Sequence, residues 1–404
     1  MSLVLNTNVN SMVAQNSLQS SGTQLASALQ QLSTGFRVNT AADDAAGYAI
    51  AQGMTSQING LNQASQNAND GVSLTQTASG AMTEIVNDLQ TMRDLAVESL
   101  NATNSANDRA DLNAQYTQLA ADINNVAANT QFNGVNLLNG TFQGADFQIG
   151  ANAGQTISVS SIASAATNAV GNYYTTAATA GAYAGVAADA GTTASFDLVV
   201  SNAAGTATNT VTTGPVTLTG NQTTDLSQIA SAINQSLGSS SGIVATVNGT
   251  SISLSTATGA AQSVTVAMNA AGSTTTEGVG ALGLDATYAL GTAGGVAQNL
   301  SNTSVTSVDN SNLVLISVDN ALQQLATSSA QLGAYQNRFQ AAITGLNTDA
   351  TNLGAAKSSI VDTNYAEATS SLSKAQILQQ AGTAMVAQAN TIPQNILTLL
   401  QKLP

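Results

Sequence analysis

The strongest constraint on this chain is an apolar repeat at both of its ends, in which apolar residues alternate at spacings of three and four. Such a repeat places one narrow apolar stripe on a helix, with an average period of 3.5 residues, and is typical of coiled coils. Near the N-terminus the repeat runs through Leu18, Gly22, Leu25, Leu29, Leu32 and Phe36. We therefore expect the N-terminal segment to form a helix that packs along another helix.

The same alternation marks residues 78–96, 112–126 and 315–353. The last stretch predicts a helix of about 45 residues or more, roughly 70 Å long at about 1.5 Å per residue. One short stripe alone would fit a globular bundle. Series this long and narrow favour an elongated rod. The expected rod core comprises Met82, Ile85, Leu89, Met92, Leu112, Leu119, Ile123, Leu322, Leu325, Leu332, Phe339, Ile343 and Leu346.

The C-terminal segment carries a further stripe that shifts by one residue beside Pro393. Proline inside a helix removes a hydrogen bond, so we expect a bend or local break near residues 391–393. Polar residues interrupt the segment well before the roughly 20 apolar residues of a membrane span, which favours an amphipathic assembly helix. The residues expected to mediate subunit assembly are Leu18, Leu25, Leu29, Leu32, Phe36, Leu378, Ala381, Met385, Ile392, Ile396 and Leu399.

Composition points to self-association. Only 7% of the 404 residues are charged, the formal net charge is -14, and residues 110–337 contain no lysine or arginine. This distribution offers nucleic acid no basic patch. Cysteine and histidine are absent, which excludes thiol nucleophiles, imidazole bases and zinc sites built on those residues. We expect no enzymatic activity, no cofactor and no metal.

The N-terminus, MSLVLNTNVN, has neither a basic region nor a sustained apolar stretch. A general secretory signal is therefore not expected, and the chain is expected to be cytoplasmic or to be exported by another route.

The middle of the chain is rich in Gly, Thr, Ser and Ala, between helical ends expected at residues 1–140 and 303–404. Residues 147–162 predict a β-hairpin. Further strands are expected at residues 195–201, 214–220, 242–249, 250–256 and 263–268, with a helix at residues 225–237 capped by Asp225 or Thr224. Linkers or irregular strands are expected at residues 163–194 and 269–302. The pattern predicts one small α+β domain.

Three local patterns could indicate ligand sites. Gly278, Gly280 and Gly283 match a dinucleotide-binding pattern, but no strand precedes them and no acidic residue follows at the required distance. Asp43 and Asp44 lack a third carboxylate nearby, so a helix-start or interface role is favoured over a cation site. The spacing in residues 309–312 is wrong for a calcium loop, and Asp309, Asn310 and Asn312 are expected to cap the long C-terminal helix.

Four segments resemble bacterial flagellins, in the family's order. They are LSTGFRVNTAADDAAGYAIA (32–51), TQFNGVNLLNG (130–140), QLGAYQNRFQAAITGL (331–346) and SLSKAQILQQAGTAMVAQANTIPQNILTLL (371–400). The resemblance implies a mainly α fold with an α+β insert: a long antiparallel coiled-coil bundle formed by both termini, a β-hairpin and a small outer β-rich domain. It further implies that residues 1–43 and 362–404 line the filament lumen. Residues 44–175 and 303–361 would then form a middle rod, and residues 176–302 a variable outer domain.

The implied function is that of a structural subunit that self-assembles into the helical tube of the flagellar filament for motility. The implied partners are other copies of the chain, an export chaperone, the type III export apparatus, and filament-cap and hook-junction proteins, with no nucleic acid and no membrane. The implied location is extracellular, reached without a cleaved signal peptide. Position 42 is Ala where many relatives have Lys, and the chain ends in QKLP.

Residues 89–100 resemble the segment that a vertebrate Toll-like receptor recognises in flagellins. Gln90, Arg93 and Leu95 match, whereas Thr91 and Gln115 stand where stimulating relatives commonly have Arg and Glu. The resemblance therefore implies weakened receptor signalling.

Three rival interpretations remain. The insert would make the chain a binding module if it recognised host glycans or surfaces. It would make the chain an enzyme if it were catalytic, which the missing Cys and His disfavour. A hook-associated junction protein shares helical termini, but residues 371–400 match filament flagellins more closely.

Overall fold

The computed structural model describes residues 8–176, 191–202, 207–237, 243–248, 251–256, 262–269, 287–290 and 295–401. The chain forms two compact units. The first comprises Met1–Asn69, Gln148–Ile157 and Gln340–Pro404, and the second comprises Asp70–Phe147 and Ser158–Phe339. Two long helices, α2 (Ala45–Ser99) and α5 (Val308–Val361), contribute residues to both units. The predicted mainly α fold with an inserted α+β region is confirmed.

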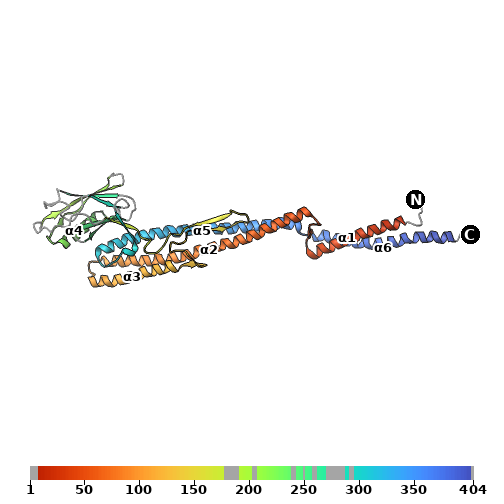
Figure 1. Ribbon diagram of the computed structural model, residues 1–404, viewed down its shortest axis with the longest axis horizontal. Helices are drawn as coiled ribbons and strands as arrows, with labels where there is room; N and C mark the ends of the chain where they lie inside the picture. The colour runs from red at the N-terminus through yellow and green to blue at the C-terminus, as the bar shows by residue number, and fades with distance from the viewer. Residues whose placement is uncertain are drawn as a thin grey trace. The chain divides into compact units, whose positions relative to one another are not determined.

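In the first unit, α1 (Val9–Thr34) and α6 (Tyr365–Gln401) lie side by side and run in opposite directions (Figure 1). The Asn8 side chain begins α1: its oxygen accepts from Ser11 N at 3.1 Å, and its Nδ2 donates to Ala389 O of α6 at 2.8 Å. Gly35 ends α1 in the left-handed conformation, with φ 75°, as an αL cap requires. The helix α6 continues through Pro393, so the predicted local break is absent.

The starts of α2 and α5 follow N-capping rules. Asp44 Oδ1 accepts from Ala46 N and Gly47 N at 3.1 and 2.9 Å, which confirms the predicted helix-start role of Asp44. The prediction for α5 was wrong in part, because the Ser307 hydroxyl caps this helix by accepting from Asn310 N at 3.2 Å. Asp309 lies in the first turn and accepts instead from Val247 N at 3.2 Å.

In the second unit, α3 (Ala106–Asn129) begins with a reciprocal capping box between Ser105 and Asp108. Together with parts of α2 and α5 it forms a helical bundle with a continuous apolar core. The largest fully buried core side chains of these helices are Tyr116, Phe339, Met82, Ile85, Leu89, Met92 and Ile123. The helical prediction for residues 130–140 was wrong, because α3 ends at Asn129 and a short hairpin follows.

That hairpin joins β1 (Gln131–Phe132) to β2 (Val135–Asn136). Its turn residues Asn133 and Gly134 both have positive φ, at 49° and 80°, as the Asn-Gly pair of a tight hairpin turn allows. The predicted hairpin in residues 147–162 is confirmed as β3 (Gly144–Gln148) paired with β4 (Thr156–Ser160).

The described residues of the inserted region form two four-stranded sheets and one helix. One sheet has the order β10 (Ile243–Asn248), β11 (Ser251–Thr256), β5 (Tyr173–Thr176) and β14 (Gly295–Gln298). The other has the order β13 (Thr287–Leu290), β12 (Gln262–Met268), β7 (Phe196–Asn202) and β8 (Ala207–Thr212). A two-stranded sheet pairs β6 (Thr193–Ala194) with β9 (Val216–Thr217), and one 3-10 turn covers Leu300–Asn302.

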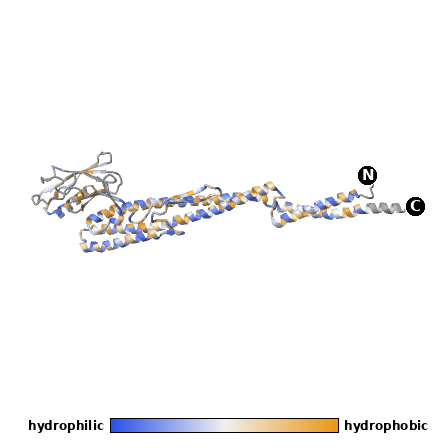
Figure 2. Cartoon of the chain, in the orientation of Figure 1, coloured by the Kyte–Doolittle hydropathy of each residue, from blue (hydrophilic) through white to orange (hydrophobic). Residues whose placement is uncertain are grey.

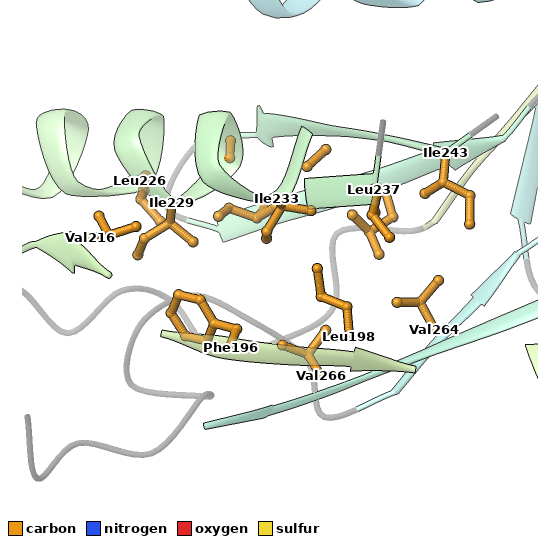
Figure 3. Close-up of a cluster of buried hydrophobic side chains, with 14 of the residues drawn as sticks. Phe196, Leu198, Val216, Leu226, Ile229, Ile233, Leu237, Ile243, Val264 and Val266 are labelled. Carbon is orange, nitrogen blue, oxygen red and sulfur yellow. The ribbon is translucent and has the colours of Figure 1, made fainter. Parts of the chain in front are cut away.

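The helix α4 (Gln222–Leu237) packs its apolar face on this region (Figure 3). Its side chains Leu226, Ile229 and Ile233 point toward Phe196 and Leu198 of β7. The predicted cap was wrong: Asp225 is buried and accepts from Thr219 N and Gly220 N at 2.7 and 3.0 Å, which holds the preceding turn. Residues 278–283, which carry the glycine pattern, lie outside the described residues.

Candidate assembly surfaces

The predicted rod-core residues lie inside the structure. Nine of them are buried: Met82, Ile85, Leu89, Met92, Leu112, Ile123, Leu325, Leu332 and Phe339. Leu346 is also buried and packs with Leu61 and Ala64 in the first unit. Leu119, Leu322 and Ile343 are half-buried. These stripes therefore serve intramolecular packing and are not free to bind another molecule.

Hydrogen bonds between polar groups connect the helices at one end of the bundle in the second unit. The buried Ser99 hydroxyl donates to Val305 O at 2.7 Å and accepts from Ser311 Oγ at 3.0 Å. Arg109 Nε donates to Ser99 O at 2.9 Å, which places a cation at the C-terminal end of α2. These contacts fix the loop after α2 against the beginning of α5.

The α1–α6 pair has a contact seam made largely of small residues. On α1 the seam follows the three-four alternation Ser11, Ala14, Leu18, Ser21, Leu25, Ala28 and Leu32, all buried or half-buried. On α6 it follows Ala368, Leu372, Ala375, Gly382, Val386 and Ala389. A Cβ on Gly382 would lie 3.1 Å from Leu18 Cδ1, so the two helices approach closely at this point.

This seam contains three of the predicted assembly residues, and five others have exposed side chains outside it. Leu18, Leu25 and Leu32 lie in the seam. Leu29 of α1 is 50% exposed, and Phe36, just beyond the end of α1, is 43% exposed. The predicted residues Leu378, Ala381 and Met385 are exposed on α6. The side chains of Ile392, Ile396 and Leu399 lie outside the described residues.

Sequence reasoning missed the alanine, serine and glycine members of the seam. Their heptad spacing was the available signal, but alanine and serine also cover the remaining faces of these helices, so composition did not single them out.

Some of the exposed apolar residues lie along two edges, which we name by their helices, while Val9, Met12, Val13 and Ile377 are exposed elsewhere on the same helices. If the seam residues occupy heptad positions a and d, the α1 edge consists of Leu29, one residue after a d position, together with Phe36, which lies two residues beyond the end of α1. The α6 edge consists of Leu378 and Met385, each one residue before an a position. In an antiparallel pair, these positions lie on opposite sides of the seam. Figure 2 shows apolar residues recurring along the coloured parts of both helices.

The link between α1 and α2 adjoins the link between α5 and α6. Phe36 forms a β-bridge with Asp362, and Arg37 N donates to Val361 O at 2.7 Å. The next turn is held by Asp43, whose carboxylate accepts from Thr40 N at 2.8 Å and Asn39 N at 3.1 Å. These hydrogen bonds to the backbone and hydroxyl of Thr40 and to Asn39 N lower the pKa of Asp43.

The receptor-like residues have unequal access to solvent. Gln90 and Gln115 are exposed, whereas Leu95 is only 8% exposed. Arg93 Nε pairs with Asp319 Oδ1 at 2.8 Å. Elsewhere on α2, partial burial raises the pKa of Asp88, and the charges of Glu84 and Asp122 raise it further.

The described residues contain no group of three or more acidic side chains placed to hold a metal ion. Nor does any described helix have the length and apolar character of a membrane span. An open groove in the first unit is lined by Gln57, Leu61, Asn152, Gln155, Asp349 and Asn352. Four of its eight lining residues carry amide side chains and three are apolar, and the Gln155 carboxamide is already engaged with Asn152 N at 3.0 Å.

Comparisons with known proteins identify both ends of the chain. Residues 5–143 match the bacterial flagellin N-terminal helical region, and residues 315–400 match the bacterial flagellin C-terminal helical region. Flagellin B of Vibrio cholerae serotype O1 is 37% identical over 406 residues, covering 99% of this chain and 100% of that protein. A flagellin of Salmonella rubislaw is 35% identical over 500 residues, with the same coverage.

Solved structures of flagellar proteins are similar as well. FliC from Burkholderia pseudomallei is 24% identical with a TM-score of 0.37, covering 66% of this chain and 99% of that chain. The flagellar junction protein FlgL from Legionella pneumophila is 14% identical with a TM-score of 0.40, covering 78% of this chain and 100% of that chain.

Proposed function

The chain belongs to the bacterial flagellin family, and from that membership we propose that the exposed edges of its two terminal helices join neighbouring subunits in the filament. Members of this family are structural subunits of the flagellar filament, which is extracellular, and they are not enzymes. The proposal concerns which residues of this chain hold the filament together.

The arrangement of the two edges supports an open polymer. The α1 edge supplies apolar side chains on one side of the seam, where α6 presents Gln376 and Thr383. The α6 edge supplies them on the other side, where α1 presents Ser17 and Gln24. The two edges are therefore different surfaces. Contacts between unlike surfaces generate rings or helical filaments, whereas a self-complementary surface generates closed dimers.

The α6 edge also exposes enough apolar surface to stabilise a contact between subunits. Leu378 is 41% exposed and Met385 is 64% exposed, and Ile377 beside them is 65% exposed. Burying such a side chain completely contributes about 1.5–3 kcal/mol, so covering the exposed part contributes on the order of 1 kcal/mol each. A filament repeats this contribution at every subunit.

Charge is distributed in a way that favours contact through the first unit. That unit contains four cations against five acids, whereas the second contains three cations against sixteen acids. Copies of the first unit can therefore pack together with little electrostatic repulsion. The second unit carries nearly all of the net charge of -14, which favours solubility where it faces water.

The small-residue seam supports coupling between ordering and assembly. Alanine, serine and glycine bury little apolar area, so the seam alone gives a two-helix pair weak stability. The neighbouring subunits that cover the edges supply the missing burial. We therefore propose that the terminal helices become fully ordered as the subunit joins the filament.

We also propose further partners for the chain and its division into three parts. Apolar edges of this kind require cover before assembly, which supports an export chaperone that binds α6. Membership of the flagellin family is what supports passage through the type III export apparatus without a cleaved signal peptide. Filament-cap and hook-junction proteins would contact the same helices at the filament ends. In the proposed three-part division, residues 1–43 with 362–404 line the lumen, residues 44–175 with 303–361 form the rod, and residues 176–302 lie outermost.

We further propose that innate-receptor signalling by this chain is weak. Leu95 is buried, so fewer of the matching side chains are free for a receptor. Thr91 and Gln115 also replace the Arg and Glu of stimulating relatives. A dose response in receptor reporter cells equal to that of a strongly stimulating flagellin would contradict this.

Electron microscopy of the purified, salted-out chain tests the assembly proposal. We expect hollow tubes from the wild-type chain and none from Met385→Asp, which places a charge on the α6 edge. A matched control is Ala384→Asp, because Ala384 is exposed and its heptad position f faces away from the seam. A monodisperse wild-type globule, or normal tubes from Met385→Asp, would refute the proposal.

A further inference from the structure

The C-terminal end of α5 receives its hydrogen bonds from a distant part of the chain. The last four carbonyl groups of a helix have no partner within it. In α5, Ser358 O accepts from Asp362 N at 2.9 Å. Val361 O accepts from Arg37 N at 2.7 Å and Val38 N at 3.4 Å, and Ile360 O accepts from Arg37 Nη2 at 2.7 Å. Arg37 thus caps two of the carbonyls.

The same segment binds the beginning of α6. Gly35 O accepts from Thr363 N at 2.9 Å, while Gly35 N donates to Gln31 O at 2.9 Å and closes α1. A Cβ on Gly35 would lie 3.1 Å from Tyr365 Oη, and the positive φ of Gly35 already disfavours other residues. Residues 35–38 and 360–363 together form what we call the joint, because α1, α5 and α6 all end or begin there.

Electrostatics favours a cation at this place. The C-terminal end of a helix carries roughly half a negative charge, and the Asp362 carboxylate follows immediately. None of the long helices α1, α2, α3, α5 and α6 has a basic residue in its own last turn. Arg109 supplies a cation to the end of α2 from outside that helix, and Arg37 does so for α5.

We infer that Arg37 is a positioning residue for assembly. By capping α5 from outside that helix, it fixes the joint and so holds the α1–α6 pair in the geometry in which its edges meet neighbouring subunits. This inference rests on the proposed function. Without the cap, the joint samples more conformations, and a larger ordering cost opposes each subunit addition.

The test compares Arg37→Met, Arg37→Lys and Arg338→Met in the full-length chain, with filaments grown from wild-type seeds. Arg338→Met is the matched control, because Arg338 is exposed and lies over the Tyr335 ring at 5.9 Å. The readouts are the critical concentration for elongation and hydrogen exchange at the Thr363 amide within filaments. Variants that elongate poorly are incorporated as isotope-labelled minor components of wild-type filaments, so that exchange is measured in every case.

The free energy that a charge-assisted hydrogen bond contributes is smallest at an exposed site. There it corresponds to about a tenfold change in an equilibrium constant. We expect Arg37→Met to raise both the critical concentration and the Thr363 exchange rate about tenfold. Arg37→Lys should recover most of the loss, because the ammonium group keeps the charge and a donor. Arg338→Met should change neither readout.

Wild-type exchange at Thr363 in Arg37→Met, or a Lys variant as defective as the Met variant, would overturn the role of Arg37. Failure of the wild-type chain to elongate at all would instead contradict the proposed function.

Discussion

Gly382 of α6 lies against Leu18 of α1, at a point where a Cβ on residue 382 would be 3.1 Å from Leu18 Cδ1. A larger side chain there has no room unless the helices separate. Gly382→Leu should therefore weaken the pair by about 1–3 kcal/mol, as overpacking does. The measurement is the thermal unfolding of assembled filaments. Gly53→Leu is the matched control, because nothing lies within 4 Å of a Cβ at that position, and equal unfolding temperatures for the two variants would contradict the observed seam.

Gly71 and Gly80 both lie in α2 and give a second comparison between two glycines. A Cβ on Gly71 would lie 2.5 Å from Phe339 Cζ, and Phe339 also makes an edge-to-face contact with Phe147 at 5.3 Å. Gly71→Ala should destabilise the helical bundle by about 1–3 kcal/mol in urea denaturation followed by circular dichroism. Gly80→Ala, with open space around the new methyl group, should stabilise by about 0.5–1 kcal/mol. The account fails if both changes stabilise the chain.

The pH dependence of stability should contain a contribution from Asp309. Burial raises the pKa of this carboxyl group from its ordinary value of 3.8, and the hydrogen bond from Val247 N offsets only part of the increase. Protonation therefore favours the folded state. The Asp309 contribution to stability is fully present below the ordinary pKa and is lost as the pH rises through the raised pKa.

Asp309→Asn should consequently be more stable than the wild-type chain at pH 7, because its side chain stays neutral and its oxygen can still accept from Val247 N. The difference should disappear as the pH falls toward about 3–4, where the wild-type carboxyl group is protonated. Thermal unfolding of both chains across this range measures the difference. A difference that does not change with pH would show that Asp309 is not the cause.

Two arginines of the second unit should differ in importance. Arg93 and Asp319 have side chains that are 43% and 53% exposed, so their ion pair is worth less than about 1 kcal/mol and should weaken further in salt. Arg109 caps Ser99 O and also donates to Asn101 O at 3.3 Å. Arg109→Ala should cost about 1–3 kcal/mol, mostly independent of salt. Urea denaturation at low and high salt compares them, and a larger loss for Arg93→Ala would contradict this assignment.

The sequence predicted the long helices well because their apolar stripes are regular. Met82, Ile85, Leu89 and Met92 recur at helical spacing, and the bundle buries all four. The α1–α6 seam was harder to predict. In an alanine-rich chain, Ala28 and Ala375 look like surface residues, whereas the larger Leu378 and Met385 look like core.

Long-range polar contacts could not be predicted from spacing. Arg37 and Ile360 are 323 positions apart, and no local pattern pairs an arginine with a distant carbonyl group. The cap of α5 was misassigned because Asp309 and Ser307 both favour helix starts. Ser307 directly precedes the first helical residue, Val308, and caps the helix, whereas Asp309 lies inside the first turn and accepts from Val247 N.

Leu378→Asp is the substitution that shows whether the α6 edge joins subunits. Leu378 is 41% exposed and lies outside the α1–α6 seam, so an aspartate there should leave the subunit folded while placing a charge in the proposed contact. Gln380→Asp, an equal change of charge at an exposed position two residues away, is the control. Electron microscopy of seeded assembly should show filaments for Gln380→Asp and none for Leu378→Asp, and normal filaments from Leu378→Asp would contradict the account.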